Sequence, residues 1–394
     1  MLVKEKIAQS IGILKELDVD CWLTFVRETQ LNGDPILPFL VNTSLTWHSA
    51  FIVSSSGRTH AIVGQYDRKS VEDLSAYDEV LGYVEGVKKP FAECMEKLNP
   101  AKIAINFSQD SEICDGLTHG MYLTLVDLLQ GIGMADRLIS AEPIISALRQ
   151  RKMPTEIEYI TRAIRSTQEI FSEAVHFIKP GKTEAEIAAF MKKRVADRGL
   201  ELAWDPKTCP SVFTGPETAG AHYNPTERVV KEGHILNMDF GVKFEGYCSD
   251  LQRTFYILEQ GEQHAPAEVQ KGFDTIVKSI EESRKALKPG VQGHEIDRIA
   301  RTIITTNGYE EFPHGLGHQV GRFPHDGTAL LGPPWEKYAK KPFVPIEESM
   351  VFTIEPRLTV PGRGIATVEE MVLVKGSGAE FLSTPQKELT LIHS

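Results

Sequence analysis

The sequence has few of the features that mark membrane, disulfide-stapled or nucleic-acid-binding proteins. Its five cysteines are widely scattered and include no C-x-x-C pair, which favours a reducing compartment. No uncharged apolar stretch reaches the ~18 residues that a membrane span requires. There is no long basic run, and the formal net charge of −11 would repel a phosphate backbone. We therefore expect a cytoplasmic protein without a membrane or nucleic-acid partner.

The composition is that of an ordinary folded protein. Hydrophobic residues make up 41% and charged residues 25% of the chain, which excludes a disordered or fibrous protein. At ~150 residues per domain, 394 residues predict two or three domains with sizeable cores.

The first domain is predicted to be α/β and to cover residues 1–153. Short apolar runs alternate there with helical patterns, and they lie at 21–25, 50–53, 60–64 and 102–106. The pattern breaks at Arg149–Pro154, and the capping-box residues Thr155 and Glu158 then predict the start of a helix. The second domain is therefore predicted to cover residues 154–394.

The second domain contains a candidate internal repeat. An amphipathic helix from Ile157 ends at Lys179-Pro180-Gly181, and another, with a Thr183/Glu186 capping box, ends near Gly199. Both helix ends recur 109 residues later, the Lys-Pro-Gly sequence at Lys288-Pro289-Gly290 and the glycine at Gly308. A shared offset indicates a duplicated half-domain, although Lys-Pro-Gly is a common helix stop and the two matches could be a coincidence.

Each predicted half is followed by a β-hairpin pattern that carries acidic residues. In residues 237–255, a turn between Phe244 and Glu245 would place Asp239 directly opposite Asp250. Opposed side chains on antiparallel strands have Cβ atoms ~4.5–5.5 Å apart, where like charges destabilise a sheet. An error of register would explain one such pair.

The second hairpin, residues 352–369, repeats this arrangement. A turn centred at Gly362 makes Glu355 face Glu369. Four carboxylates held together must share protons or bind hard cations, because uncompensated buried charge costs several kcal/mol per group. Two divalent ions and a bridging hydroxide would leave a single net negative charge. An isolated acidic residue, by contrast, is usually exposed or salt-bridged.

The segment between the hairpins supplies histidines. His314, His318 and His325 lie within residues 313–326, a stretch rich in glycine, which lets the backbone approach closely and the imidazoles converge. A lone histidine is more often a satisfied polar residue than a ligand. Carboxylates with one imidazole suit Mn²⁺, Co²⁺, Fe²⁺ or Zn²⁺ in paired sites.

Together these residues resemble a known superfamily, the "pita-bread" enzymes that include proline peptidases, creatinase and methionine aminopeptidases. The resemblance covers about residues 155–394 and rests on Asp239, Asp250 within Ser249–Phe255, Gly317-His318, Gly321, His325-Asp326, Thr353, Glu355-Pro356 and Glu369-Glu370. The preceding α/β domain matches the Xaa-Pro dipeptidase (prolidase) and aminopeptidase P branch, whereas methionine aminopeptidases usually lack it. The implied fold is α+β, with a duplicated pita-bread domain after a smaller α/β domain.

The resemblance also implies a role for each site residue. Asp239 would chelate one divalent ion, Asp250 and Glu369 would bridge two, and His318 and Glu355 would hold the second. Manganese is expected first, with cobalt, zinc or iron as alternatives. The catalytic residues would be His222 beside the scissile bond, His325 at the tetrahedral intermediate and Glu355 as the proton carrier, and His314 would bind the substrate.

Two positions depart from the pattern of the proline-specific members. Thr367 stands where they commonly have an arginine, and Arg357 stands where they commonly have a glycine after Glu-Pro. In the predicted register these two residues face each other. We therefore hypothesise that Arg357 supplies the missing positive charge and binds a substrate carboxylate.

The predicted function is a metal-dependent exopeptidase that cleaves Xaa-Pro bonds in dipeptides or at peptide N-termini. A non-peptide amidohydrolase or lyase acting on a small solute on the same scaffold is the alternative. A catalytically inactive binding module is a third reading, but such a module would normally have lost ligands. The resemblance further implies a homodimer, in which the first domain restricts access to short substrates.

Overall fold

The computed structural model describes residues 2–217 and 224–393. Its contacts divide the chain into two compact units, Met1–Arg149 and Gln150–Ser394. The boundary that we predicted after residue 153 coincides with the start of helix α7 (Pro154–Phe177), a few residues beyond this division. None of the helices in the described residues is both long enough and apolar enough to cross a bilayer.

The N-terminal unit is built on a six-stranded mixed sheet in the order β4-β3-β2-β1-β5-β6. Four of its strands are the predicted ones, namely β1 (Cys21–Val26), β2 (Ser49–Ser54), β3 (Thr59–Gly64) and β5 (Ile103–Ile105). The others are β4 (Glu79–Tyr83) and β6 (Leu138–Ser140), and the helices are α1 (Leu2–Glu16), α2 (Leu37–Leu40), α3 (Arg68–Glu72), α4 (Lys88–Leu98), α5 (His119–Gln130) and α6 (Glu142–Gln150).

The C-terminal unit begins with two helices and a set of short strands. Its first half consists of α7, α8 (Glu184–Asp197), β7 (Glu201–Leu202), β8 (Ser211–Thr214), β9 (Ile235–Phe240), β10 (Val242–Phe244), β11 (Tyr247–Cys248) and β12 (Leu251–Ile257). The strand order β20-β12-β9-β8 joins this half to the last strand of the chain.

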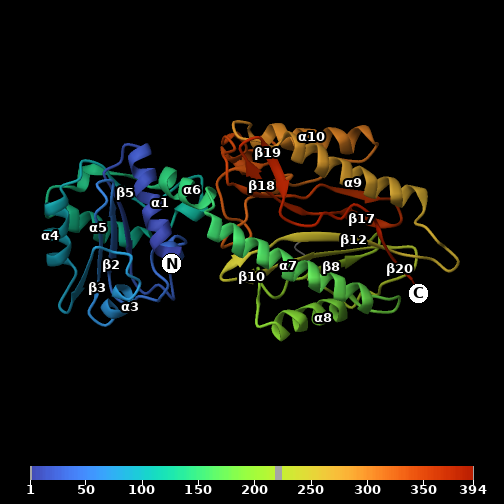
Figure 1. Ribbon diagram of the computed structural model, residues 1–394, viewed down its shortest axis with the longest axis horizontal. Coiled ribbons are helices and arrows are strands. Elements are labelled where there is room, and N and C mark those ends of the chain that lie inside the picture. Colours follow the sequence, from blue (N-terminus) through green and yellow to red (C-terminus); the bar gives the residue numbers. More distant parts are fainter. Residues whose placement is uncertain (1, 218–223, 394) are drawn as a thin grey trace. The chain divides into compact units, whose positions relative to one another are not determined.

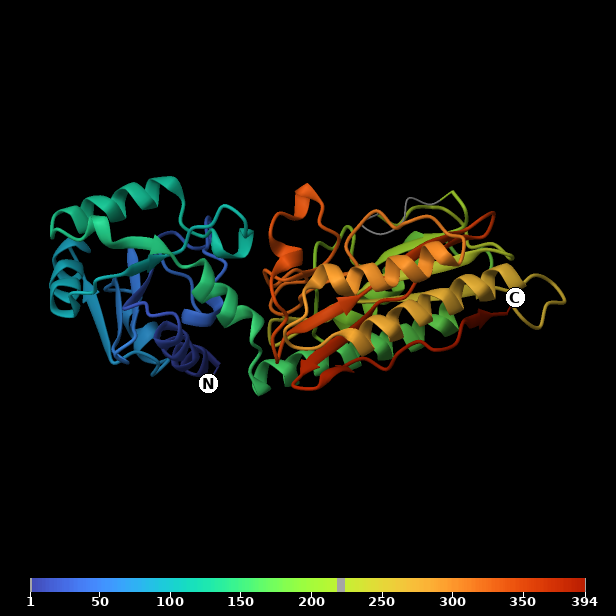
Figure 2. The ribbon, with the colours of Figure 1, turned by 90° about the horizontal axis from the view of Figure 1, so that it is seen from above.

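The second half repeats the plan of two helices followed by strands. It consists of α9 (Ala267–Ala286), α10 (Gly293–Thr306), β13 (Gly317–His318), β14 (Leu330–Leu331), β15 (Val351–Ile354), β16 (Arg357–Val360), β17 (Gly364–Thr367), β18 (Glu370–Lys375), β19 (Gly378–Phe381) and β20 (Thr390–Ile392). Figures 1 and 2 show α7 and α8 on one side of the strands and α9 and α10 on the other.

Matching contacts in the two halves confirm the internal repeat. The Gly181 N–H donates to the Val230 carbonyl at 3.0 Å, and the Gly290 N–H donates to the Ile346 carbonyl at 2.9 Å. The N-cap residues before α8 and α10, Thr183 and Gln292, each donate their N–H to the side chain of a glutamate three positions later. Both glycines have positive φ, 94° and 90°, which is the conformation that glycine adopts without strain. The two Lys-Pro-Gly segments that follow α7 and α9 are therefore structurally equivalent.

The start of α7 differs from our prediction. The helix begins two residues earlier than a Thr155 cap would place it, with Met153 as N-cap and Pro154 in its first turn. The Glu156 side chain, and not Glu158, accepts the Met153 N–H at 2.8 Å. Proline explains the shift, because its fixed φ suits the first helical position and its missing N–H costs nothing there.

The register predicted for the first hairpin is also wrong. Asp239 is paired with Gln252, not with Asp250. The turn is formed by Glu245 and Gly246, whose φ values of 50° and 76° are those of a primed two-residue hairpin turn. Since the register moves by two residues, Asp250 stays on the same face as Asp239 and becomes its diagonal neighbour.

The register predicted for the second hairpin is confirmed. Ile354 pairs with Glu370 in the β15–β18 ladder, and Arg357 pairs with Thr367 in the β16–β17 ladder. Both ladders have the same register, so Glu355 and Glu369 lie at the junction between them. There the Glu369 N–H leaves its own hairpin and donates to the Gln252 carbonyl at 3.1 Å.

The capping box of α8 provides a test of this local structure. The Thr183 hydroxyl accepts the Glu186 N–H at 3.1 Å, and Thr183→Ala removes that bond. We expect a cost of ~1 kcal/mol, seen as hydrogen exchange about fivefold faster in the first turn of α8. The matched control is Thr302→Ala at an exposed position inside α10. Equal exchange in both variants would contradict the assignment.

Candidate metal centre

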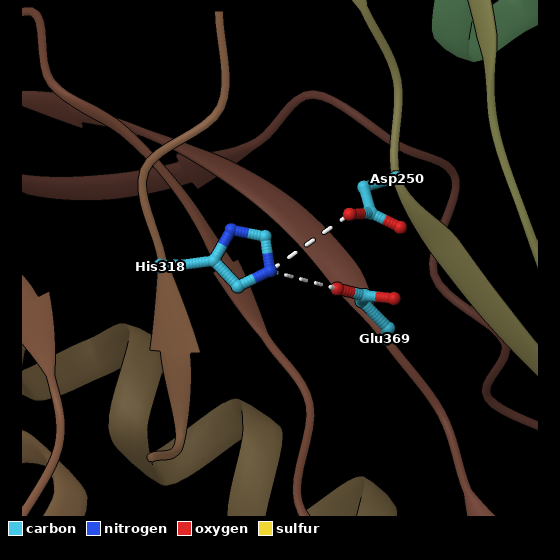
Figure 3. A group of neighbouring side chains, drawn as sticks. All are labelled: Asp250, His318 and Glu369. Atoms are coloured by element: carbon cyan, nitrogen blue, oxygen red, sulfur yellow. Dashed lines mark ion pairs between the residues drawn. The ribbon is translucent and has the colours of Figure 1, made fainter. Parts of the chain in front are cut away.

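The five predicted ligands lie at the ends of strands from both halves of the C-terminal unit. Asp239 is in β9, Asp250 immediately precedes β12, and His318 ends β13. Glu355 immediately follows β15, and Glu369 immediately precedes β18. Figure 3 shows the His318 imidazole pointing between the carboxylates of Asp250 and Glu369, although the three residues come from separate strands.

The distances are those of a compact ligand group. One ligand atom each from Asp250, His318 and Glu369 lies within 4.8 Å of the others. The His318 Nε2 atom is 3.3 Å from Glu355 Oε1, 3.8 Å from Asp250 Oδ2 and 4.0 Å from Glu369 Oε1. Asp239 lies near enough to Asp250 and Glu355 for their charges to raise its pKa. The five predicted ligands therefore converge.

Two buried oxygen atoms in this group lack a hydrogen-bond donor. Asp239 is 8% exposed and Glu369 is 1% exposed. Asp239 Oδ1 and Glu369 Oε2 have no hydrogen-bond partner among the described residues. A buried acceptor without a donor costs about 1–3 kcal/mol, and more if it is charged. Carboxylate oxygens and one imidazole form a donor set that a divalent cation fits.

The pKa values of these carboxyl groups also show that their negative charges are not fully compensated. Burial and the charges of Asp250 and Glu355 raise the pKa of Asp239 well above its ordinary value. Burial and the neighbouring carboxylates do the same to the pKa of Glu369. Burial raises the pKa of Asp250 to about 7, although the His318 charge opposes this shift. Without a cation, protons must therefore neutralise part of the group.

His318 and Glu355 form the shortest of the ion pairs that the imidazole makes with carboxylates of the described residues. Burial favours the neutral imidazole, but the hydrogen bond and charge of Glu355 raise the pKa of His318. Burial likewise opposes ionisation of Glu355, but the hydrogen bond and charge of His318 lower the pKa of that carboxyl. Glu355 is thus the carboxylate of the group that ionises most readily.

The other predicted histidines are placed differently. The rings of His325 and His318 meet edge to face with centroids 4.2 Å apart. The His314 Nδ1 donates to the Gly315 carbonyl at 2.8 Å, which leaves Nε2 for another partner. His314 and His325 both lie near enough to Glu355 for their charges to lower its pKa. His222 falls within residues 218–223, outside the described residues.

Arg357 extends from the strand opposite Thr367, as predicted. The side chain is half-buried, and burial lowers the pKa of its guanidinium. No hydrogen bond or ion pair joins it to any of the described residues. A desolvated cation of this kind favours an anionic partner.

Supporting residues that the sequence analysis did not identify surround the ligands. Arg253 forms a buried ion pair with Glu370 at 3.1 Å and donates to the Glu369 carbonyl at 2.9 Å. Gln252 donates to Glu355 at 3.1 Å. Arg253 and Glu370 belong to the motifs on which the resemblance rests, which assigned them no role, and no pattern in the sequence distinguishes Gln252.

We predict that Asp239→Asn has opposite effects in the metal-free and metal-loaded protein. Without metal, the substitution removes a buried carboxyl group whose negative charge is repelled by the neighbouring carboxylates. The Tm should therefore rise by about 2–4 °C. With Mn²⁺, the stabilisation by ligand binding should largely disappear because a ligand is lost. Calorimetric scans with and without Mn²⁺ measure both effects. Asp274→Asn, on an exposed position of α9, should change neither, and a lower metal-free Tm for Asp239→Asn would contradict the prediction.

Comparisons with known proteins agree with this geometry. Residues 158–376 match the model of metallopeptidase family M24. A candidate Xaa-Pro aminopeptidase from Mycoplasma genitalium is 30% identical over 299 residues, which are 73% of this chain and 79% of that protein.

Solved structures similar to this chain have the same two-domain fold. The Xaa-Pro dipeptidase from Bacillus anthracis has a TM-score of 0.76 at 23% identity and covers 99% of each chain. The X-Pro aminopeptidase from Thermotoga maritima MSB8 has a TM-score of 0.75 at 25% identity and covers 97% of this chain and 100% of its own. The chain therefore belongs to metallopeptidase family M24, as a hydrolase with the two-domain pita-bread architecture of the Xaa-Pro dipeptidase and aminopeptidase branch.

Proposed function

We propose that this protein is an exopeptidase that hydrolyses Xaa-Pro bonds in dipeptides or at peptide N-termini. The observation that carries the proposal is the convergence of several carboxylates and one imidazole, with two of the carboxylate oxygens lacking a hydrogen-bond donor among the described residues. The names of the M24 relatives from Mycoplasma genitalium and Thermotoga maritima support the choice of bond.

We propose two divalent ions in this centre. Asp239 would hold one ion, His318 and Glu355 would hold the other, and Asp250 and Glu369 would bridge both. An oxygen-rich set with one imidazole favours Mn²⁺, with Co²⁺, Zn²⁺ and Fe²⁺ as alternatives. When bound, such a pair supplies a water nucleophile that is active near neutral pH and polarises the substrate carbonyl.

Glu355 is the proposed proton carrier. One of its oxygens is 3.3 Å from His318 Nε2, and the other accepts from Gln252 at 3.1 Å. A carboxylate that stays ionised beside the nucleophile takes the proton from the attacking water and delivers it to the departing amine.

The histidines are proposed to act on the substrate. His325 would donate a hydrogen bond to the oxyanion of the tetrahedral intermediate, where a good donor is worth ~2.7–4 kcal/mol. His314 would bind the substrate through Nε2, because its Nδ1 is already used by the Gly315 carbonyl. His222 would lie beside the scissile bond, a role that rests on its sequence motif alone.

Arg357 is the proposed receptor for a substrate carboxylate. Its half-buried guanidinium has no anionic partner among the described residues, and a free C-terminal carboxylate would provide one. A guanidinium binds a carboxylate through two parallel hydrogen bonds, which fixes its orientation. The proposal favours substrates short enough for that carboxylate to reach Arg357.

We also propose that the protein is a homodimer and acts in the cytoplasm. All five cysteines are free and buried, which suits a reducing compartment. Light scattering should give the mass of two chains.

Removal of the metal provides the main test of the activity. We expect exhaustive chelation to abolish cleavage of an Xaa-Pro library, and Mn²⁺ or Co²⁺ to restore it. Asp250→Ala should lose both turnover and metal, because this residue would serve both ions. The same panel includes small amides without a peptide bond, and cleavage of these alone would favour the alternative function. Activity that survives chelation would refute the mechanism.

The role of Arg357 is tested by comparing free and amidated substrates. We expect Arg357→Ala to raise KM about 10-fold or more for peptides with a free carboxylate, and less than about twofold for their C-terminal amides. This loss corresponds to one charge-assisted interaction of ~1.5–3 kcal/mol. Arg298→Ala, at an exposed position of α10, is the matched control. An unchanged KM for every cleaved substrate would end the hypothesis.

A further inference from the structure

Gln252 lies beside the candidate metal ligands and contacts Glu355 and Glu369, but it is itself uncharged. It is the residue paired with Asp239, and its own backbone carbonyl accepts the Glu369 N–H at 3.1 Å. Gln252 is 4% exposed, so its side-chain amide must find hydrogen-bond partners inside the protein.

The two ends of the Gln252 amide have different partners. Its Nε2 donates to Glu355 Oε2 at 3.1 Å. Its Oε1 accepts from the Thr367 hydroxyl at 3.0 Å. The donor end therefore faces a carboxylate, and the acceptor end faces a hydroxyl.

Thr367 is itself held in place. Its N–H donates to the Thr254 hydroxyl at 3.1 Å, and its carbonyl accepts from that hydroxyl at 2.6 Å. Thr367 is 2% exposed, so water does not compete for its side chain. A reversed Gln252 amide would present its oxygen to the Glu355 carboxylate, where two acceptors repel each other. The Glu355 carboxylate, which only accepts, therefore sets the amide orientation, and the Thr367 hydroxyl holds the other end by donating to Oε1.

We propose that Gln252 is a positioning residue of the metal centre, and that Thr367 acts through it. The oriented amide holds Glu355 Oε2, which leaves Oε1 directed at the His318 side of the centre, 3.3 Å from Nε2. Thr367 stands where proline-specific members commonly have arginine. The hydrogen bond from Thr367 to Gln252 therefore depends on a residue in which this chain departs from the family pattern. The proposal rests on the proposed metal-dependent function.

A double-mutant cycle tests the link between the two residues. The variants are Gln252→Met, Thr367→Val and their combination, with Thr367→Ser as the variant that keeps the hydroxyl. Thr359→Val is the matched control, because Thr359 is an exposed threonine on the neighbouring strand of the same hairpin. Each variant is measured by calorimetric titration with Mn²⁺, by kcat and KM on a cleaved peptide, and by Tm, which shows that it folds.

Gln252→Met should weaken Mn²⁺ binding and lower kcat by about 10–100-fold, the usual effect of losing a residue that orients metal ligands. Thr367→Val should cause a smaller loss of about 5–10-fold, with KM changed less than about twofold. In the Gln252→Met background, Thr367→Val should cause no further loss, because its effect passes through the amide. Thr367→Ser should restore both quantities to within about threefold of the original.

The proposal is overturned if the two losses multiply in the double variant, or if Thr367→Val behaves like Thr359→Val. These outcomes differ from a failure of the proposed function. If the unmodified protein binds Mn²⁺ but cleaves no Xaa-Pro peptide, the substrate assignment fails while the Mn²⁺ titrations still decide the role of Gln252. If it binds no Mn²⁺, the metal centre and this inference both fail.

Discussion

Repulsion among buried carboxylates is the constraint on which the C-terminal unit depends. Asp239, Asp250 and Glu369 are held together in a region where burial and mutual charge raise their pKa values. A protein that keeps such a group must compensate it with protons, with hydrogen-bond donors or with cations. His318 and Gln252 provide part of the compensation, and the two oxygens that lack donors mark what is left for a metal.

The surrounding structure makes this costly arrangement stable. The residues lie at strand ends, where the backbone is fixed by ladders on both sides, and the strands are covered by paired helices (Figures 1 and 2). Arg253 ties β12 to Glu370 and to the Glu369 carbonyl, so a buried ion pair supports the ligand from behind. Function in this unit therefore depends on the positions of strand ends more than on any one loop.

Much of this could be predicted from the sequence, because it depends on periodicity and residue type. The helix faces, the repeat at Gly181 and Gly290, and the register of the second hairpin follow from such patterns. The register of the first hairpin did not, since it depends on positive φ at Glu245 and Gly246, which moves the pairing by two residues. The convergence of the acids was still predicted correctly, because an even shift keeps side chains on the same face.

Other features depend on tertiary contacts that no local pattern reports. Strand β6 has three residues, and β4 is partly exposed, so neither shows a distinct hydrophobic signal. Gln252 is an uncharged amide whose importance comes from what surrounds it, and Met153 caps a helix only because proline follows.

The repeat also bears on how such a centre could arise. The two aspartates belong to the first half of the unit, whereas the histidine and both glutamates belong to the second. Neither half carries a complete donor set, so an ancestor of half this length would have needed a second copy of itself to build a comparable cage.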